Sequence, residues 1–228
     1  MNNGPPNSAN GGYACGLLAT AAQSYLDGRI AVSLHRPPPL ETNLTVRPAG
    51  WRVHLWTNDG DLIGGAVSTT ARIDAPPPLP APLVRQAADR FRGPAGHPFP
   101  TCFVCGVVRT AGDGLNLRPG PVADRAGVVA CDWSPDATVA GPDGIVEAAM
   151  VWAVLDCPCG WTTDPVARPR VLSWMSARID ALPALGRRYA VAAQVNEIKD
   201  RTAATAAVLF EVDTGVVLAE ATSIWTTV

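Results

Sequence analysis

The sequence has almost no lysine and almost no net charge. Lys199 is the only lysine among 18 basic residues, and the formal net charge of the 228-residue chain is -2. Because there is no basic excess, nothing attracts the chain electrostatically to nucleic acid or to an anionic membrane surface, and we expect neither partner. Hydrophobic residues make up 47% of the chain, but no stretch reaches the roughly 20 apolar residues of a membrane span.

Other recognisable segments are also missing. The first residues (MNNGPPNS) contain no basic or long apolar region, so we expect no secretory signal and predict a cytoplasmic protein whose six cysteines are reduced thiols. No phosphate-binding glycine loop or dinucleotide fingerprint is present, so the sequence predicts no cofactor. The three histidines, His35, His54 and His97, are isolated in sequence, and we expect no catalytic role for them.

A proline-rich segment divides the chain. Eight prolines lie between residues 74 and 100, which excludes a helix interior or a central strand from most of this stretch. We therefore expect a first half at residues 1–74, a stiff linker at residues 75–100 with a short helix near residues 82–92, and a second half at residues 101–228.

The two halves have the same order of predicted elements. Each begins with an apolar helix, at about residues 12–25 and 144–156, followed by four strands. The strands are expected at residues 30–34, 42–47, 52–56 and 62–73, and again at 171–179, 189–195, 203–210 and 216–225. Because the order of a helix followed by four antiparallel strands occurs once in each half, the sequence predicts a duplicated α+β fold. The second half has further strands near residues 115–122 and 127–133, so we expect that the leading strand of the first half is missing or that the chain start is truncated.

The most informative residue is Asp156, at the end of the second predicted helix. Ala149, Trp152 and Ala153 precede it on one helical face, and Pro158 predicts that the helix stops just after the acid. Apolar surroundings and the negative end of a helix both raise the pKa of a carboxyl group. Such an acid is either paired or takes part in chemistry, whereas a partly exposed helix-end aspartate is the alternative.

The order of these motifs resembles the hotdog-fold acyl-CoA thioesterase superfamily. The resemblance is carried by CFVCG at residues 102–106, GLNL at 114–117, the helix that ends in Asp156, and a strand that runs into Pro183. In many members a His-Gly-Gly opens the central helix, an aspartate follows seven residues later, and a Thr or Ser lies ten residues before a proline. The resemblance implies a double hotdog, in which two antiparallel sheets are each wrapped around a central helix.

The resemblance also implies a site shared between the halves. Asp156 stands at the aspartate position, and Ser173, ten residues before Pro183, stands at the hydroxyl position. Residues 10–12 (NGG) take the His-Gly-Gly place in the first half, so the N–H of Gly12 or its neighbour would hold the oxyanion. The residues expected to contact the substrate are Gly11, Tyr13, Trp152 and Ala149.

A second site, formed by the start of the second helix and the aspartate position of the first helix, would be incomplete. Residues 147–149 (EAA) stand where His-Gly-Gly would open the second helix, and Ala19 stands at the aspartate position of the first. An alanine methyl group cannot accept a proton or attack a carbonyl. We therefore expect one working site in each chain.

The cysteines raise the question of zinc. Cys102 and Cys105 have the spacing of half a zinc site, and Cys157 and Cys159 could supply the rest. Pro158 separates Cys157 from Cys159, and this makes them poorly suited as the second pair of zinc ligands. Relatives of this fold usually carry such cysteines as buried thiols. The sequence therefore predicts no bound metal. Cys15 and Cys131 are expected in the core.

Three functions remain open. The leading one is hydrolysis of an acyl-CoA or a similar thioester. The second is a non-catalytic acyl-CoA or lipid-binding protein on the same fold, favoured by the missing histidine and by Ala148 and Ala149 in place of glycines. The third is a hotdog hydratase or dehydratase, for which the second half offers no His/Asp or His/Glu arrangement. Any homo-oligomer would form through the outer sheet surfaces or edges.

Overall fold

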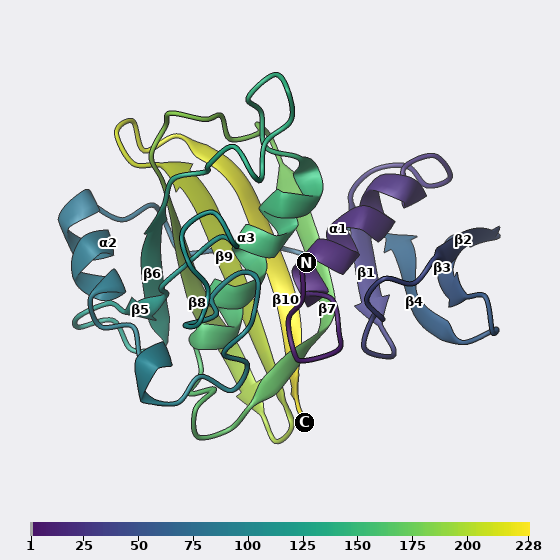
Figure 1. Cartoon of the computed structure of the whole chain (residues 1–228), viewed down its shortest axis with the longest axis horizontal. Coiled ribbons are helices and arrows are strands. Elements are labelled where there is room, and N and C mark those ends of the chain that lie inside the picture. Colours follow the sequence, from purple (N-terminus) through teal and green to yellow (C-terminus); the bar gives the residue numbers. More distant parts are fainter. Residues whose placement is uncertain (1) are drawn as a thin grey trace.

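All ten strands belong to one antiparallel sheet. The computed structural model describes residues 2–228, and its strand order is β2-β3-β4-β1-β7-β10-β9-β8-β6-β5 (Figure 1). The first half supplies β1 (Ile30–Leu34), β2 (Leu44–Ala49), β3 (Arg52–Thr57) and β4 (Leu62–Ser68). The second half supplies β5 (Gly120–Pro121), β6 (Val128–Trp133), β7 (Arg170–Ile179), β8 (Tyr189–Lys199), β9 (Thr202–Glu211) and β10 (Val217–Thr227).

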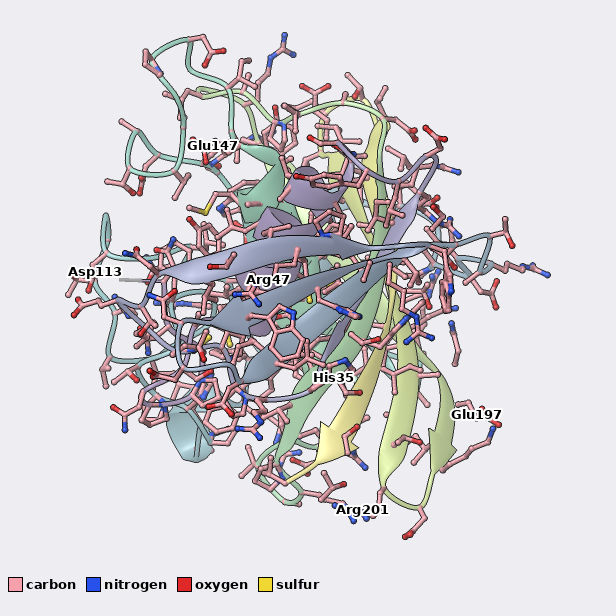
Figure 2. The ribbon with its side chains drawn as sticks, turned by 90° about the vertical axis from the view of Figure 1, so that its right-hand side faces the viewer. His35, Arg47, Asp113, Glu147, Glu197 and Arg201 are labelled. Atoms are coloured by element: carbon pink, nitrogen blue, oxygen red, sulfur yellow. The ribbon has the colours of Figure 1, made fainter. Side chains whose placement is uncertain are left out.

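The two sheets expected from the sequence are joined edge to edge. β1 pairs with β7 in antiparallel register, with Val32 opposite Met175. Across this joint the Ser176 hydroxyl donates a hydrogen bond of 2.9 Å to the carbonyl oxygen of Ile30. The chain therefore has one ten-stranded sheet rather than two separate ones. Figure 2, which looks onto the first half, shows its strands crossing the front of the molecule, with Arg47 on β2.

The strand positions expected from the sequence agree with the structure except near some strand ends. β4 ends at Ser68, five residues before the predicted end, and the strand expected near residues 115–122 is reduced to the two residues of β5. Within residues 2–228 the first half has no counterpart of β5 and β6, and the segment before its helix forms only an isolated bridge between Asn3 and Ala9.

The two central helices pack closely against each other on one face of the sheet. They are α1 (Gly11–Ala22) and α3 (Ala148–Trp161) (Figure 1). A methyl group on Gly12 would lie 2.4 Å from the Asp156 Cβ atom, and one on Gly16 would lie 2.7 Å from the Ala149 Cα atom. Because one turn separates the two glycines, they form a single flat strip on α1, and this strip lets the helix backbones touch. The pairing also shows that the helices run antiparallel.

α3 does not stop at Asp156. It continues through Pro158 to Trp161, so the predicted helix end was wrong. A proline inside a helix removes one backbone hydrogen bond and costs about 3 kcal/mol. Here the residues around it, from Leu155 to Gly160, are all buried, and this packing offsets the lost bond. Asp156 is consequently the ninth of the 14 helical residues and lies away from the helix terminus.

The linker covers the opposite face of the sheet. Its helix, α2 (Ala81–Ala88), buries Val84 and Ala87 against β6, β8 and β9. Along β8 the side chains alternate: Val191 packs into the cluster that contains α3, and Ala192 into the cluster that contains α2. The second half is therefore a three-layer structure. No helix in the described part of the chain is long and apolar enough to cross a membrane.

Candidate functional site

A cavity of about 630 Å³ opens beside the start of α1. Its walls come from both halves and from the end of the linker, and the side chains and backbone that matter below are those of Gly11, His97, Cys105, Asp156, Arg170 and Ser173. Most of the remaining wall is proline and other apolar residues. The cavity therefore offers an apolar space with a few polar groups, which is the usual composition of a small-molecule site.

Asn10 connects the start of α1 to Asp156. As the N-cap residue, its side-chain oxygen accepts a hydrogen bond of 2.9 Å from the Tyr13 N–H. Its side-chain nitrogen donates to Asp156 Oδ2 at 3.0 Å, and the Gly12 N–H donates to the same oxygen at 3.0 Å. The first-half segment NGG thus fixes the carboxyl group of the second half in one orientation.

Two polar groups beside this cavity have no partner. Asp156 Oδ1 is buried and accepts no hydrogen bond. The N–H of Gly11, the first residue of α1, makes no hydrogen bond within residues 2–228, as is usual for the open N–H groups of a first helical turn. Gly11 and Asp156 both line the cavity, so the residues that carry these two groups belong to the same wall.

Burial controls the acidity of Asp156. The side chain is only 2% exposed, and burial raises its pKa to about 7, although the hydrogen bonds from Gly12 and Asn10 act in the opposite direction. The raised pKa that the sequence predicted is therefore present, but its cause is burial rather than a helix end. A carboxyl group with this pKa can both accept and release a proton near neutral pH.

Ser173 lies on the same cavity but does not touch Asp156. Its hydroxyl donates to the carbonyl oxygen of Ile224 at 3.0 Å and accepts from the Thr226 hydroxyl at 3.0 Å. Both partners belong to β10, the neighbouring strand. The serine expected to assist the acid is thus hydrogen-bonded within the sheet.

Three residues expected to contact substrate do not line this cavity. Trp152 and Ala149 are buried where α3 meets the glycine strip of α1, because Gly12 and Gly16 leave space there. The Tyr13 N–H is used by the Asn10 cap, and its side chain packs against the core. The substrate contacts that the sequence assigned to these three residues are therefore not found at the cavity, whereas Gly11 does line it.

Arg170 is a cavity residue that the sequence did not indicate. It is only 6% exposed, its Nε has no hydrogen-bond partner, and it forms no ion pair within the described residues. Burial, followed by the charge of Arg168, lowers the pKa of Arg170. Arg36 also lines the cavity but is paired with Asp61 at 2.7 Å. An arginine that lines the cavity without an acid partner in the described residues favours an anionic ligand.

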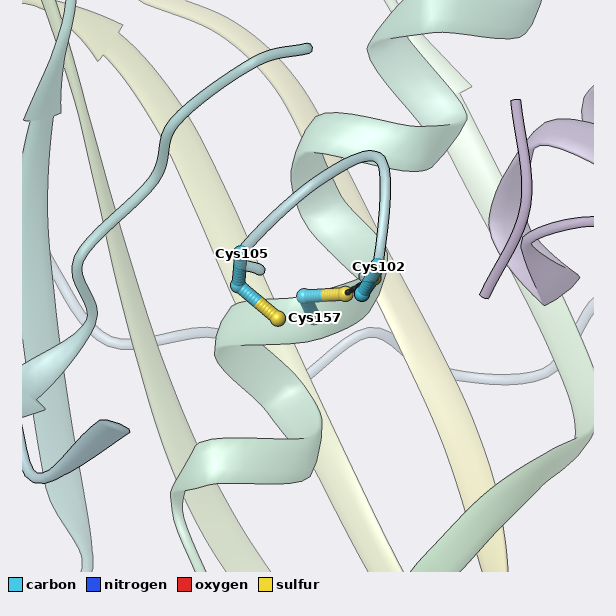
Figure 3. Close-up of side chains that lie close together, drawn as sticks. All are labelled: Cys102, Cys105 and Cys157. Atoms are coloured by element: carbon cyan, nitrogen blue, oxygen red, sulfur yellow. Dashed lines mark hydrogen bonds between the residues drawn. The ribbon is translucent and has the colours of Figure 1, made fainter. Parts of the chain in front are cut away.

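Three cysteines meet on the same side of the cavity. Cys102 and Cys105 lie on the loop after the linker, and Cys157 lies on α3 next to Asp156 (Figure 3). Hydrogen bonds from Cys105 and Cys157 lower the pKa of Cys102 well below its usual value, and sharing these bonds raises the pKa values of Cys105 and Cys157. The sequence indicated the spacing of the first two, but it could not indicate which α3 cysteine would join them.

His97 also belongs to this cavity, although the sequence gave it no role. Its Nε2 atom lies 3.2 Å from the Cys105 Sγ atom. Its Nδ1 accepts a hydrogen bond of 2.9 Å from the Phe99 N–H, so Nε2 carries the proton and donates to the sulfur. Burial lowers the pKa of His97, which favours this neutral form.

The chain resembles solved thioesterase structures along nearly its whole length. A TesB protein from Mycobacterium avium subspecies paratuberculosis superposes with a TM-score of 0.61 at 14% identity, covering 98% of this chain and 89% of the other. A structure named as a thioesterase, from Novosphingobium aromaticivorans, gives a TM-score of 0.56 at 16% identity, covering 98% and 90%. No family model matches the chain, and no curated protein matches it in sequence.

A third structure matches only part of the chain. It is a hypothetical thioesterase protein from Streptococcus pneumoniae with coenzyme A, which covers 45% of this chain and 82% of its own at a TM-score of 0.42 and 13% identity. That likeness is too weak to support an inference about a ligand. The two longer matches show that the chain has the fold of the thioesterase superfamily, the hotdog fold that the sequence predicted.

Proposed function

We propose that this protein is a thioesterase-like hydrolase that cleaves an acyl-CoA or a related thioester in the cavity beside α1. The observation that carries the proposal is the pair of unsatisfied groups on one wall, Asp156 Oδ1 and the Gly11 N–H. Hydrolysis of a thioester needs one acceptor for a proton of water and one donor for the developing oxyanion. The shared fold supports this reaction class by analogy.

Asp156 acts as the general base in this proposal. Oδ2 is held by Asn10 and Gly12, and Oδ1 is left to accept a proton from a water molecule. The water oxygen attacks the thioester carbonyl carbon, the carbon–sulfur bond breaks, and the protonated carboxyl group returns its proton to the departing thiolate. The products are a carboxylic acid and a free thiol. Attack by the carboxylate itself is a variant of the same chemistry, with water entering in a second step.

We assign the oxyanion contact to Gly11 rather than to Gly12 or Tyr13. The N–H groups of Gly12 and Tyr13 are already bonded, to Asp156 and to Asn10 respectively. The Gly11 N–H is the free one, and it lies at the positive end of the α1 dipole. In this assignment the first half supplies the oxyanion donor and the second half the base, as expected for an internally duplicated hotdog.

The lining favours a thioester that has both an apolar and an anionic part. Apolar side chains such as Phe99 and Leu172 can contact an acyl chain, and the unpaired Arg170 can bind phosphate or carboxylate oxygens. Acyl-CoA combines both features. Comparison of thiol release from different acyl-CoAs identifies the acyl group.

Binding without turnover is the second candidate. It is favoured by the two hydrogen bonds that hold Asp156 Oδ2 and by the asparagine that stands where many thioesterases have histidine. In that case the same cavity would retain an acyl-CoA or a lipid, and no thiol would be released.

Release of free thiol from short, medium, long and aromatic acyl-CoAs tests the proposal. We expect turnover of at least one of these classes, and we expect Asp156→Asn to lower it by about a hundredfold or more, because the amide cannot accept the proton. Asp180→Asn is the matched control, since Asp180 is exposed and paired with Arg178. An Asp156→Asn variant with full turnover would remove the acid from the mechanism. Saturable binding with no turnover by the wild type would favour the second candidate.

A further inference from the structure

We infer that Cys102, Cys105 and Cys157 together bind one thiophilic divalent cation, with zinc as the expected ion. This inference does not depend on the proposed hydrolysis, and it reverses the expectation from the sequence that the chain binds no metal. It starts from the positions of the three sulfur atoms, all of which lie within 4.8 Å of one another (Figure 3).

The spacing of the sulfurs fits coordination and not a disulfide. The Cys102 and Cys157 Sγ atoms are 3.7 Å apart, and all six cysteines of the described chain are free thiols. Two zinc–sulfur bonds of about 2.3 Å at a tetrahedral angle hold their sulfurs roughly 3.8 Å apart. A disulfide requires about 2.05 Å. The observed separation, at which one thiol donates to the other, is also that of two ligands of one tetrahedral ion.

The loop that carries the first two cysteines is a tight turn. The turn closes with a bond of 2.9 Å from the Gly106 N–H to the carbonyl oxygen of Cys102. A methyl group on Gly106 would lie 2.4 Å from that oxygen, so only glycine fits there. This compact turn holds Cys102 and Cys105 close together.

The Cys105 and Cys157 sulfurs receive donors from side chains. Cys105 Sγ receives the indole N–H of Trp161 at 3.5 Å and the Nε2 proton of His97 at 3.2 Å. Asn10 Nδ2 lies 3.8 Å from Cys157 Sγ. A neutral thiol is a weak acceptor, whereas a thiolate accepts such bonds strongly, so these donors would stabilise the sulfurs once a bound ion has displaced their protons. Donor groups around ligating sulfurs are the usual outer contacts of a metal centre.

A bound cation would balance the negative charge of three thiolates. The exposed fractions of Cys102, Cys105 and Cys157 are 3%, 4% and 7%, so thiolates there would be three buried negative charges. Buried charges of one sign are unfavourable unless an ion or an opposite charge balances them. A divalent ion bound to three thiolates leaves a net charge of only −1. Soft sulfur ligands select zinc and similar ions over magnesium or calcium.

Cys159 is excluded from this site by the helix. Two residues along α3 from Cys157, it lies about 200° around the helix axis and faces Thr205 and Ser223 on the sheet. The pairing of Cys157 with Cys159 considered from the sequence is therefore wrong. The ion has three protein ligands, and its fourth position is left to water or to a small molecule in the cavity. It would tie the loop after the linker to α3, one residue from Asp156.

Elemental analysis of protein purified without chelator or metal-affinity resin tests the site directly. We expect about one zinc per chain in the wild type and in Cys159→Ser, a buried cysteine of the same helix outside the cluster. We expect a large loss of zinc in Cys102→Ser and Cys157→Ser. Cobalt added to metal-free protein under reducing conditions should give a thiolate-to-cobalt charge-transfer band in the near ultraviolet, absent in Cys157→Ser.

A second measurement on the wild type does not require the variants to fold. Alkylation followed by peptide mapping should show Cys102, Cys105 and Cys157 protected with zinc and modified faster once a chelator removes it, while Cys131 is unaffected. A wild type that holds far less than one zinc and gives no cobalt band would overturn the inference, as would equal zinc loss in Cys159→Ser. None of these readouts depends on thioester hydrolysis, so a protein with zinc but no turnover refutes only the proposed function.

Discussion

The starts of α1 and α3 occupy equivalent places in the two halves, yet only the start of α1 has a side-chain cap and a bound carboxyl group. At α1, Asn10 caps the helix with its side chain and binds the acid of the other half. At α3, Glu147 stands at the N-cap and makes no side-chain capping hydrogen bond. The side chains that follow differ as well, since α1 opens with glycines whereas α3 opens with Ala148 and Ala149.

This difference shows how a duplicated fold can gather its polar groups at one end. Glycine lets α1 bring backbone N–H groups against a carboxylate, whereas the antiparallel course of the helices carries Ala19 toward the uncapped start of α3. One end therefore combines donors, acid and cavity. The other end keeps the packing but has neither the cap nor the acid.

Substitution of Gly12 should affect the α1 end most strongly. The methyl group of Gly12→Ala would meet the Asp156 Cβ at 2.4 Å and the Trp152 carbonyl oxygen at 2.6 Å, and neither can move without shifting α3. We expect turnover to fall at least tenfold and the free energy of unfolding to fall by about 1–3 kcal/mol. Thiol release and denaturant unfolding measure the two effects.

Gly65→Ala is the matched control for that substitution. Gly65 lies on β4, and the nearest atom to an added methyl group, on His54, is 3.4 Å away, which is ordinary contact. We expect little change in turnover or stability. Equal effects of the two substitutions would mean that the contact between α1 and Asp156 has no special importance.

The stoichiometry of ligand binding tests whether the α3 end is a second site. Calorimetric titration with a thioether analogue of an acyl-CoA, which cannot be hydrolysed, should give one ligand per chain. The reason is that the uncapped α3 start has alanines where α1 has glycines, and Ala19 where α3 has Asp156. Two equivalent ligands per chain would show that the two ends are functionally alike.

Ser173→Ala should have the smallest effect. The serine hydroxyl is bonded to Ile224 and Thr226 and not to Asp156, so its loss leaves the acid and its two donors in place. We expect turnover to stay within about threefold of the wild type, with a stability loss of about 1 kcal/mol from the missing hydrogen bonds. A hundredfold loss, comparable with that expected for Asp156→Asn, would return Ser173 to the catalytic machinery.

The sequence predicted the elements of the fold better than their connections. The strand-like runs of β7–β10 and the apolar character of α1 and α3 were sufficient to locate these elements, because each depends on residues close together in the chain. Pairing of β1 with β7 joins segments 140 residues apart, and no local pattern predicts that the two sheets become one. Pro158 misled the prediction because tertiary packing maintained the helix against a local breaker.

The sequence predicted the residues at the centre of the candidate site, but it did not predict the residues that line the cavity around them. Asp156 and residues 10–12 were found through spacing, and the structure brings them into hydrogen-bond contact. Trp152 was placed in the substrate channel because it lies one turn before the acid, but the glycine strip of α1 covers it instead. Arg170 and His97 gave no signal, because an arginine at a strand start and a histidine in a proline-rich stretch are both ordinary on a surface.

The joint between the halves has a consequence for how the molecule opens. β1 and β7 share only three register pairs, whereas β7 and β10 share nine. The backbone hydrogen bonds between β1 and β7 therefore hold the two halves together only weakly. The packing of α1 against α3 supplies the rest of the contact between them. The hydrogen bonds from Asn10 and Gly12 to Asp156 lie in that contact. The carboxylate is therefore also a cross-link between the halves, and fraying of the first half would uncover the cavity and release the acid in a single event.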